Sequence, residues 1–234
     1  MTAGALRPDV GVVIVAGGAG TRVGGRELKQ FRWVAGKPML LHSVQTFMAR
    51  ADVCCVVCVL PQAAVGDPPP WLFQCDVARL MLSVGGRTRQ GSVANGLDDL
   101  PDEAEIVLIH DAARPLVGSD TIDRVVAATR ATGAAIAALP VVDTIKRVDP
   151  DGRIVGTLDR EGLWRAQTPQ GFSRAVIVRA HREAKVARVT MTDDAGLCER
   201  LGIPVATVRG SERALKITDE ADFARAESQF PLPE

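Results

Sequence analysis

The chain lacks an excess of charge of either sign, and it lacks a long apolar run. Lys and Arg together number 28, as do Asp and Glu, so the formal net charge is zero. Proteins that coat nucleic acid or bind a membrane surface usually carry a basic excess, so we expect neither partner. No apolar stretch approaches the length of a membrane span, and no signal-peptide core is visible near the first residue. We therefore expect a cytoplasmic protein.

Histidine is scarce, and cysteine occurs in an odd number, five. His42, His110 and His181 show no metal-ligand spacing, and we interpret them as structural. Cys55 and Cys58 have the C-x-x-C spacing of zinc and redox sites. Residues three apart in a strand point to opposite faces, however, and no second Cys/His pair lies nearby. The cysteines are therefore interpreted as core residues.

The 234 residues suit an α/β fold with a sizeable core. Runs rich in β-branched or small apolar residues predict strands over residues 11–15, 53–60, 80–84, 106–110, 134–139 and 203–208. Helical patterns cover residues 38–50, 119–132, 173–185 and 218–228, the second with a Ser-Asp cap at its start and Gly133 at its end. This alternation predicts a single domain, 1–234, with a doubly wound, mostly parallel sheet. A nucleotide would then bind at the carboxyl ends of the strands.

A glycine-rich loop follows the first predicted strand and is the most informative part of the chain. The run Val12–Val15 ends in Ala16-Gly17-Gly18-Ala19-Gly20, with Arg22 and Lys29 downstream. Glycines allow backbone N–H groups to approach phosphate oxygens closely, and two cations suit a polyphosphate whose charge grows during reaction. The spacing is neither that of a P-loop nor that of a dinucleotide-binding loop. The alternative is an ordinary turn followed by two solvated cations.

Three further motifs accompany this loop: His110-Asp111-Ala112-Ala113-Arg114-Pro115, Asp143-Thr144-Ile145-Lys146 and Trp164-Arg165-Ala166-Gln167-Thr168-Pro169-Gln170. In this order, over residues 12–227, they resemble the nucleotidylyltransferases of nucleotide sugars and polyol phosphates. The resemblance implies transfer of a cytidylyl group from CTP to a polyol phosphate, with release of pyrophosphate. Residues 143–147 and 164–170 favour 2-C-methyl-D-erythritol 4-phosphate, of the non-mevalonate isoprenoid pathway, over ribitol 5-phosphate. A non-catalytic nucleotide sensor is less consistent with Arg22 and Lys29.

The resemblance also assigns roles to residues near the nucleotide. Arg22 and Lys29 would stabilise the transition state. The residues in contact with the base and triphosphate would be Ala16, Gly17, Gly18, Gly20, Gly86, Arg87 and Ser92. The chain departs from the family at Leu28, where proline is usual, and at Arg87, where an acidic residue is common. Alternatively, Arg87 and Arg89 are surface charges at a helix cap.

Acceptor binding is implied for four residues: Thr144, Arg160, Thr168 and Lys216. Asp111 and Arg114 are also expected to position substrate, Asp111 by accepting a hydrogen bond from a sugar hydroxyl and Arg114 by facing a phosphate. Asp111 could instead bind Mg²⁺ or another divalent cation, which would also contact substrate phosphates. An ordinary helix-cap aspartate is the alternative for Asp111, and surface solvation is the alternative for Arg160 and Lys216.

Residues 141–160, here called the arm, break the alternation of strands and helices. Two strand-like pieces flank Asp149-Pro150-Asp151-Gly152, which predicts a hairpin turn. Because an isolated two-stranded hairpin is marginally stable, it needs a partner surface. The resemblance implies a homodimer in which each arm embraces the other subunit, so that Thr144 and Arg160 serve the neighbour's pocket. The alternative is an arm folded onto its own domain.

Overall fold

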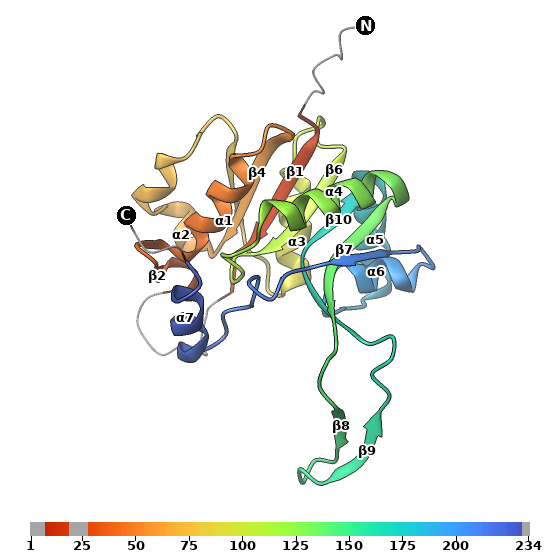
Figure 1. The fold of residues 1–234 in the computed structure, drawn as a ribbon. Coiled ribbons are helices and arrows are strands. Elements are labelled where there is room, and N and C mark those ends of the chain that lie inside the picture. The colour runs from red at the N-terminus through yellow and green to blue at the C-terminus, as the bar shows by residue number, and fades with distance from the viewer. Residues whose placement is uncertain (1–7, 19–27, 231–234) are drawn as a thin grey trace, which may run out of the picture.

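A seven-stranded sheet forms the centre of the molecule in the computed structural model, which describes residues 8–18 and 28–230 (Figure 1). The strands lie in the order β11-β7-β10-β6-β1-β4-β5. They run parallel to one another except β10, which is antiparallel to β6 and β7. Their bounds are β1 Val10–Val15, β4 Val53–Leu60, β5 Leu80–Val84, β6 Ile106–Asp111, β7 Ala134–Pro140, β10 Trp164–Ser173 and β11 Ala206–Arg209. The predicted α/β class and mostly parallel sheet are confirmed.

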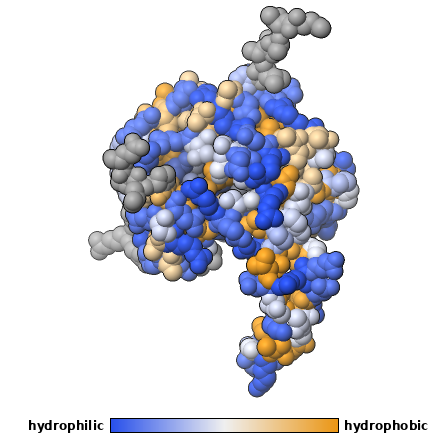
Figure 2. All heavy atoms as spheres, in the orientation of Figure 1, coloured by the Kyte–Doolittle hydropathy of each residue, from blue (hydrophilic) through white to orange (hydrophobic). Residues whose placement is uncertain are grey.

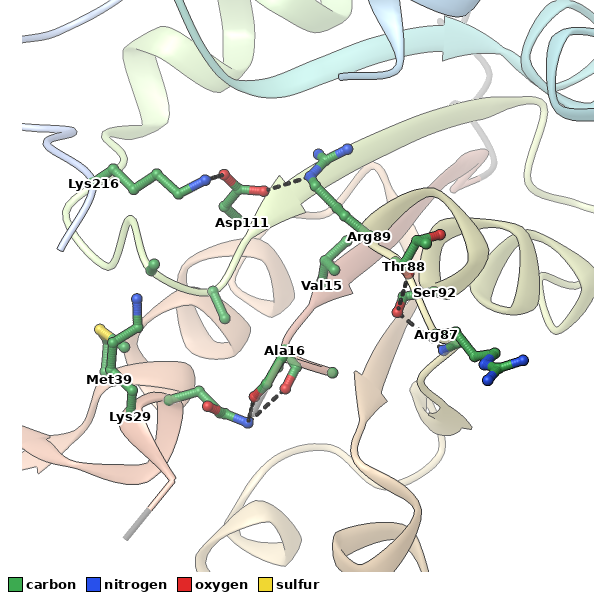
Figure 3. A pocket seen from close by; sticks show the side chains of 16 residues that line it. Val15, Ala16, Lys29, Met39, Arg87, Thr88, Arg89, Ser92, Asp111 and Lys216 are labelled. Carbon is green, nitrogen blue, oxygen red and sulfur yellow. Dashed lines mark hydrogen bonds and ion pairs between the residues drawn. The ribbon is translucent and has the colours of Figure 1, made fainter. Parts of the chain in front are cut away.

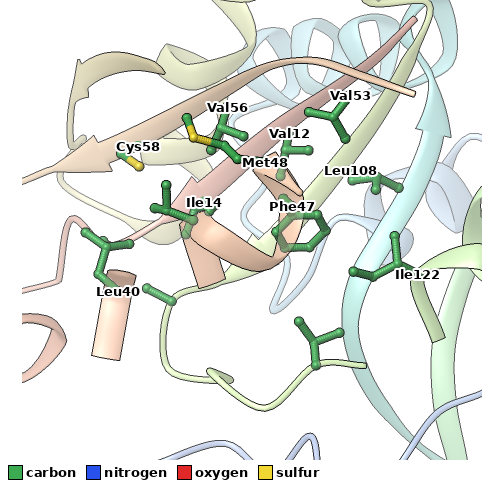
Figure 4. Close-up of a cluster of buried hydrophobic side chains, with 14 of the residues drawn as sticks. Val12, Ile14, Leu40, Phe47, Met48, Val53, Val56, Cys58, Leu108 and Ile122 are labelled. Carbon is green, nitrogen blue, oxygen red and sulfur yellow. The ribbon is translucent and has the colours of Figure 1, made fainter. Parts of the chain in front are cut away.

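Helices cover both faces of this sheet. The helices are α1 Met39–Met48, α2 Gln62–Gly66, α3 Arg89–Asp98, α4 Ser119–Thr132, α5 Arg174–Ala187, α6 Ala195–Arg200 and α7 Glu220–Glu227, with short 3₁₀ helices Lys29–Phe31 and Pro70–Gln74. Side chains of α1, α2 and α4 pack on one face, and those of α3, α5 and α6 pack on the other. Successive residues of β1 therefore enter different clusters: Val12 and Ile14 pack with Phe47 of α1 (Figure 4), and Val13 packs with α3. This arrangement is the predicted doubly wound fold.

The order of the strands creates a crevice beside β1. The chain leaves β1 for β4 and then β5 on one side, and it returns to β6 on the other side. Connections that diverge from neighbouring strands leave space at their carboxyl ends, where α/β proteins bind ligands. Val15 is paired with Asp111 at the ends of β1 and β6. The glycine loop and the Asp111 motif therefore meet at this crevice.

Cys55 and Cys58 lie on opposite faces of β4, as predicted. Cys58 packs in the cluster with α1, and Cys55 packs in the cluster with α3. Both thiols are buried and free. Burial raises the pKa of the Cys58 thiol, which makes it unreactive as a thiolate. Their role is therefore that of core residues.

The sequence did not predict every local feature correctly. The predicted Ser-Asp cap is wrong, because α4 begins at Ser119 with Gly118 as N-cap and without a side-chain cap. The predicted end is confirmed, since Gly133 adopts the left-handed conformation with φ +85°. Strand β11 runs from Ala206 to Arg209 rather than over 203–208, and β10 was not predicted as a strand. The first three residues of β10 are exposed and its register shifts after Ala166, so it lacks a regular apolar pattern.

The arm projects from the sheet and does not fold back onto it (Figure 1). Strands β8 Ile145–Val148 and β9 Ile154–Leu158 pair antiparallel as a separate two-stranded sheet. Apolar side chains lie open along it, as Figure 2 shows; Ile154 is 65% exposed and Val155 59%. The predicted hairpin is confirmed, and the alternative in which it packs on its own domain is wrong. Dimerisation through the arm stays a prediction.

A small subdomain closes the other side of the crevice. Strands β2 Trp33–Val34 and β3 Lys37–Pro38 pair antiparallel, and Val34 and Met39 pack with Ile217 and Phe223. Asp219 begins α7 with a capping box. This packing brings the segment after Lys216 beside the segment that contains Lys29.

None of the described helices is long and apolar enough to cross a membrane.

Candidate active site

The loop after β1 lies directly against the loop after β5. A Cβ added to Gly17 would lie 3.1 Å from the Cα of Gly85, and one added to Gly85 would lie 3.0 Å from the Cα of Gly17. The two backbones approach this closely because neither residue has a side chain. Gly17 and Gly86, the residue after Gly85, line one wall of a cavity of about 550 Å³ at the carboxyl ends of β1, β5 and β6. The two glycine motifs of the sequence therefore belong to one site.

The side chain of Gln30 holds the first loop in place. Its Nε2 donates to the carbonyl oxygens of Ala16 at 2.6 Å and Gly18 at 3.2 Å, and the side chain is buried. Ala16, Gly17 and Gly18 line the cavity, whereas Gly20 and Arg22 lie outside the described residues. Gln30 was not identified from the sequence, because an amide beside Lys29 belongs to no recognised motif.

The second loop is shaped by hydrogen bonds between residues close in sequence at the start of α3. The N–H of Gly86 donates to Ser92 Oγ at 3.0 Å, and this hydroxyl donates to the carbonyl of Thr88 at 3.0 Å. Thr88 is the N-cap of α3 and accepts from the N–H of Gly91. Gly86, Arg87 and Ser92 all line the cavity, with Ser92 buried and Arg87 exposed. In Figure 3 the Arg87 side chain points away from Asp111.

Asp111, the last residue of β6, lies between two cations (Figure 3). Arg89 Nε donates to Oδ1 at 3.1 Å, and Lys216 Nζ donates to Oδ2 at 2.7 Å. Burial by itself would raise the pKa of Asp111, but the charges of Arg89 and Lys216 hold it well below its ordinary value. The carboxylate is therefore ionised, and the helix-cap interpretation is wrong because its partners are cations.

Lys29 reaches the same cavity from the short helix Lys29–Phe31. Its Nζ donates to the carbonyl of Ile217 at 2.8 Å. Lys216, the preceding residue, also lines the cavity. Two lysines that are far apart in sequence therefore contribute to one wall, and the interpretation of Lys216 as a simply solvated surface charge is wrong because it pairs with Asp111.

A smaller cavity of about 210 Å³ contains Arg114 and Thr168 and shares Asp111, Arg89 and Lys216 with the main one. Arg114 Nη1 donates to the carbonyl of Ala214 at 2.7 Å. Thr168 is buried, and its hydroxyl accepts from the N–H of Asp111 at 3.1 Å. It also lies 3.0 Å from His110 Nδ1. Thr168 thus stabilises the end of β6 as well as lining the cavity.

Thr144 and Arg160 lie apart from these cavities. Both are exposed and lie on the arm, where Arg160 Nη1 donates to the carbonyl of Val142. Neither residue lines the cavities that hold Asp111. Four of the six residues expected to position substrate are therefore brought together within this subunit, and the two on the arm are not.

Arg89 has a different environment from the one expected for a surface charge. It begins α3, and its guanidinium bridges Asp111 and Asp194, with Nη1 2.6 Å from Asp194 Oδ2. Burial by itself would lower the pKa of Arg89, but the two carboxylates raise it above its ordinary value. Arg89 is therefore charged. The surface-cap interpretation is wrong for this residue. Asp194 gave no signal in the sequence, because its link to Arg89 spans 105 residues.

The buried histidines stabilise their neighbours. His110 Nε2 lies 3.2 Å from the carbonyl of Arg114, and burial lowers the pKa of His110 to about 4, so it is neutral near pH 7. His181 Nε2 lies 3.0 Å from Asp194 Oδ1. His42 contacts the carbonyl of Val34. These contacts agree with the interpretation of the histidines as structural residues. The contact between His181 and Asp194 also links His181 to Arg89, because Asp194 pairs with both.

The donor set of the main cavity suits a lightly held divalent cation rather than a protein cage. Asp111 is the one acidic side chain among the described residues that line it. The described residues contain no group of three or more His, Cys, Asp or Glu side chains able to hold a metal ion. Mg²⁺ commonly takes one or two carboxylates together with water and substrate phosphates. The arrangement fits that mode of binding.

A glycine loop at the switch point of a doubly wound sheet, facing lysines and an ionised aspartate, is suited to a polyphosphate and agrees with a nucleotidyltransferase. The sequence matches the family model "IspD: 2-C-methyl-D-erythritol 4-phosphate cytidylyltransferase" over residues 10–231. The chain belongs to this family.

Relatives and solved structures agree with this assignment. A 2-C-methyl-D-erythritol 4-phosphate cytidylyltransferase from Syntrophus aciditrophicus (strain SB) is 41% identical over 226 residues, covering 95% of this chain and 96% of that one. A bifunctional enzyme IspD/IspF from Desulfotalea psychrophila is 41% identical over 218 residues, covering 93% of this chain. The chain spans 55% of that relative's length. The crystal structure of the cytidylyltransferase from Thermus thermophilus is 34% identical with a TM-score of 0.80, covering 94% of this chain and 98% of that one.

Proposed function

We propose that this chain transfers the cytidylyl group of CTP to 2-C-methyl-D-erythritol 4-phosphate, the reaction that the name of its family states. The single observation that carries the proposal is the family match over residues 10–231, which includes the described walls of the cavity. The cavity itself suits the reaction, because glycine backbone and cationic side chains face the same space. Ribitol 5-phosphate as acceptor is not favoured, because the match is to the methylerythritol family.

The chemistry requires two anions to meet. An oxygen of the acceptor phosphate forms a bond to the α-phosphorus of CTP, while the bond from that phosphorus to the α–β bridging oxygen breaks. Pyrophosphate leaves with the bonding electrons. The acceptor oxygen is already anionic, so no general base is needed, and catalysis comes from positioning and from preorganised cations.

CTP would bind along the wall that the two glycine loops form together. The triphosphate would lie along Ala16, Gly17 and Gly18, and Gly20, which is outside the described residues, would contact it as well. The base would lie near Gly86, Arg87 and Ser92. Support comes from the close approach of Gly17 and Gly85, which leaves backbone as the surface there. Lys29, which lines the opposite wall, would stabilise the charge that develops at the α-phosphorus, together with Arg22.

The acceptor would bind in the smaller cavity beside Asp111. Lys216 and Arg114 would contact its phosphate, while Asp111 and Thr168 would contact its polar groups or hold the residues that do. Thr144 and Arg160 would come from the arm of a second subunit in a homodimer. The exposed apolar side chains of the arm support this assembly, since they need a covering surface.

Mg²⁺ or another divalent cation would be held by Asp111 and the substrate phosphates. When bound, it would neutralise part of the negative charge on the triphosphate. The fit rests on the single carboxylate of the cavity and on the preference of Mg²⁺ for oxygen ligands.

The single-domain organisation and the cytoplasmic location stay predictions.

The proposal is tested by pyrophosphate release with each nucleoside triphosphate and a panel of polyol phosphates. We expect release with CTP and 2-C-methyl-D-erythritol 4-phosphate well above every other pair. Faster pyrophosphate release with ribitol 5-phosphate would show that this compound is the acceptor instead. Saturable CTP binding without pyrophosphate release would favour a nucleotide sensor.

A further inference from the structure

A continuous line of polar and charged side chains leads from the buried face of α5 to the cavity. His181 Nε2 lies 3.0 Å from Asp194 Oδ1, and Asp194 Oδ2 accepts from Arg89 Nη1 at 2.6 Å. Arg89 Nε then donates to Asp111, which also pairs with Lys216. Asp194 has a side chain only 1% exposed, so its charge is compensated by these partners rather than by water.

The two cations beside Asp111 are held very differently. Arg89 is fixed at both ends of its guanidinium, by Asp111 and by Asp194. Asp194 is itself fixed, because its N–H and that of Ala195 both donate to Gln170 Oε1 at 3.1 Å. Lys216 has a side chain 44% exposed and no second carboxylate partner among the described residues. Arg89 is therefore a permanent partner of Asp111, and Lys216 is an exchangeable one.

Lys216 also borders the space into which it could turn. It lines the main cavity, the smaller cavity of Arg114 and Thr168, and a third of about 450 Å³ that contains Arg114 and Arg165. An anion that enters this space would compete with Asp111 for the lysine. If Arg89 were absent, the departure of Lys216 would leave the buried carboxylate of Asp111 without a positively charged side chain beside it, which is strongly unfavourable.

We propose that Arg89, fixed by Asp194, is a positioning residue that keeps Asp111 oriented while Lys216 leaves Asp111 for the acceptor phosphate. The proposal rests on the proposed function, since it requires an anionic acceptor in the cavity beside Lys216. The contribution of Asp194 to turnover then passes through Asp111, although Asp194 touches neither substrate.

The test is a double-mutant cycle between Asp194→Asn and Asp111→Asn. Asparagine keeps the shape of Asp194 and removes the charge that fixes Arg89. We expect Asp194→Asn to lower kcat/KM for the acceptor about tenfold in the parent and less than about twofold in the Asp111→Asn background, as for coupled residues. The KM for CTP should not change. Equal losses in both backgrounds, or a loss that falls on CTP, would overturn the proposal.

Two further measurements keep the cycle decisive. Where turnover is too low to measure, calorimetric titration gives the acceptor affinity of each variant in the same cycle. The protein is first bound to a CTP analogue whose α–β bridge resists cleavage. If Asp194→Asn lowers the melting temperature so far that the protein is unfolded at the assay temperature, Arg89→Lys replaces it, because lysine keeps the charge but lacks the planar fork whose separate nitrogens hold the two carboxylates. A parent inactive with every polyol phosphate refutes the proposed function, whereas an active parent with an uncoupled cycle refutes this inference alone.

Discussion

The two ends of the central sheet each contain an arginine that bridges two aspartates. At the amino end, Arg50 pairs with Asp52 at 2.8 Å and with Asp123 at 2.6 Å. At the carboxyl end, Arg89 pairs with Asp111 at 3.1 Å and with Asp194 at 2.6 Å. Both guanidinium groups are mostly buried, with side chains 14% and 26% exposed. The aspartates are more exposed at the amino end, where Asp123 is 63% exposed, than at the carboxyl end, where Asp194 is 1% exposed, but the pairing distances are similar.

The difference lies in what surrounds each bridge. Asp52 precedes β4 and Asp123 lies on α4, and neither borders a cavity that also holds the glycine loops. Asp111 borders that cavity together with Lys29 and Lys216. The same chemistry therefore stabilises the fold at the amino end and shapes a binding site at the carboxyl end. Location at the switch point of the sheet decides the role.

The largest expected effect comes from Lys29 at the carboxyl end. Lys29→Ala should lower kcat by roughly 10²–10³, because one preorganised donor to the developing charge is lost. Its melting temperature should remain close to that of the parent, since the side chain is only partly buried and its described bond is to the carbonyl of Ile217. Stopped assays and thermal unfolding separate the two effects. Near-parental turnover would remove Lys29 from the mechanism.

The arm extends the comparison to a second subunit. Deletion of residues 142–157 should convert a homodimer into a monomer, because the exposed apolar side chains of β8 and β9 are removed. Turnover should fall at least about tenfold, since removal of an oriented binding group misplaces the acceptor. Analytical ultracentrifugation and the pyrophosphate assay measure the two outcomes. A truncated protein that remains a fully active dimer would contradict exchange of the arm.

A smaller effect is expected from Arg160 on the arm. Arg160→Lys should lower kcat/KM for the acceptor about tenfold, because lysine keeps the charge but loses the planar fork that can hold two phosphate oxygens. Calorimetric titration with CTP should show an unchanged affinity. Arg153→Lys is the matched control, since Arg153 is also exposed on the arm and pairs with Asp151. If the Arg160 variant instead weakens CTP binding alone, the residue belongs to the other substrate.

The smallest effect should come from the bridge at the amino end. Arg50→Lys should lower the free energy of unfolding by about 1–2 kcal/mol, in the range for charge-assisted hydrogen bonds, and leave turnover unchanged. Arg89→Lys should lower kcat/KM for the acceptor about tenfold as well as reducing stability. Urea denaturation and steady-state kinetics on both variants give the comparison. Equal kinetic losses in both would mean that the bridges act only through stability.

The sequence predicted those features whose cause is local. Alternating apolar runs and helical patterns indicated the doubly wound sheet, because periodicity follows directly from which face each residue buries. Gly133 marked the end of α4 because few other residues adopt a positive φ there easily. Asp149-Pro150-Asp151-Gly152 indicated the hairpin for a similar reason, and Gly152 has φ +80°.

The features that were missed depend on contacts between distant segments. Gln30 fixes the glycine loop through carbonyl groups, Arg89 meets Asp194 across 105 residues, and Lys29 meets Ile217 across 188. A helix-cap arginine and a bridging arginine have the same local pattern, so Arg89 could not be distinguished from a surface charge. Strand β10 was missed because it joins the sheet antiparallel after the arm, with an irregular register.

The most direct test of the central claim is a crystal structure of the protein with CTP bound. We expect the triphosphate to lie along Ala16 to Gly18 and within reach of Lys29, with the cytosine against Gly86 and Ser92. The pair Arg89–Asp111 should remain intact. A nucleotide bound elsewhere, for example in the open groove beside Arg174 and Arg182 at the opposite end of the sheet, would contradict the assignment of this cavity as the active site.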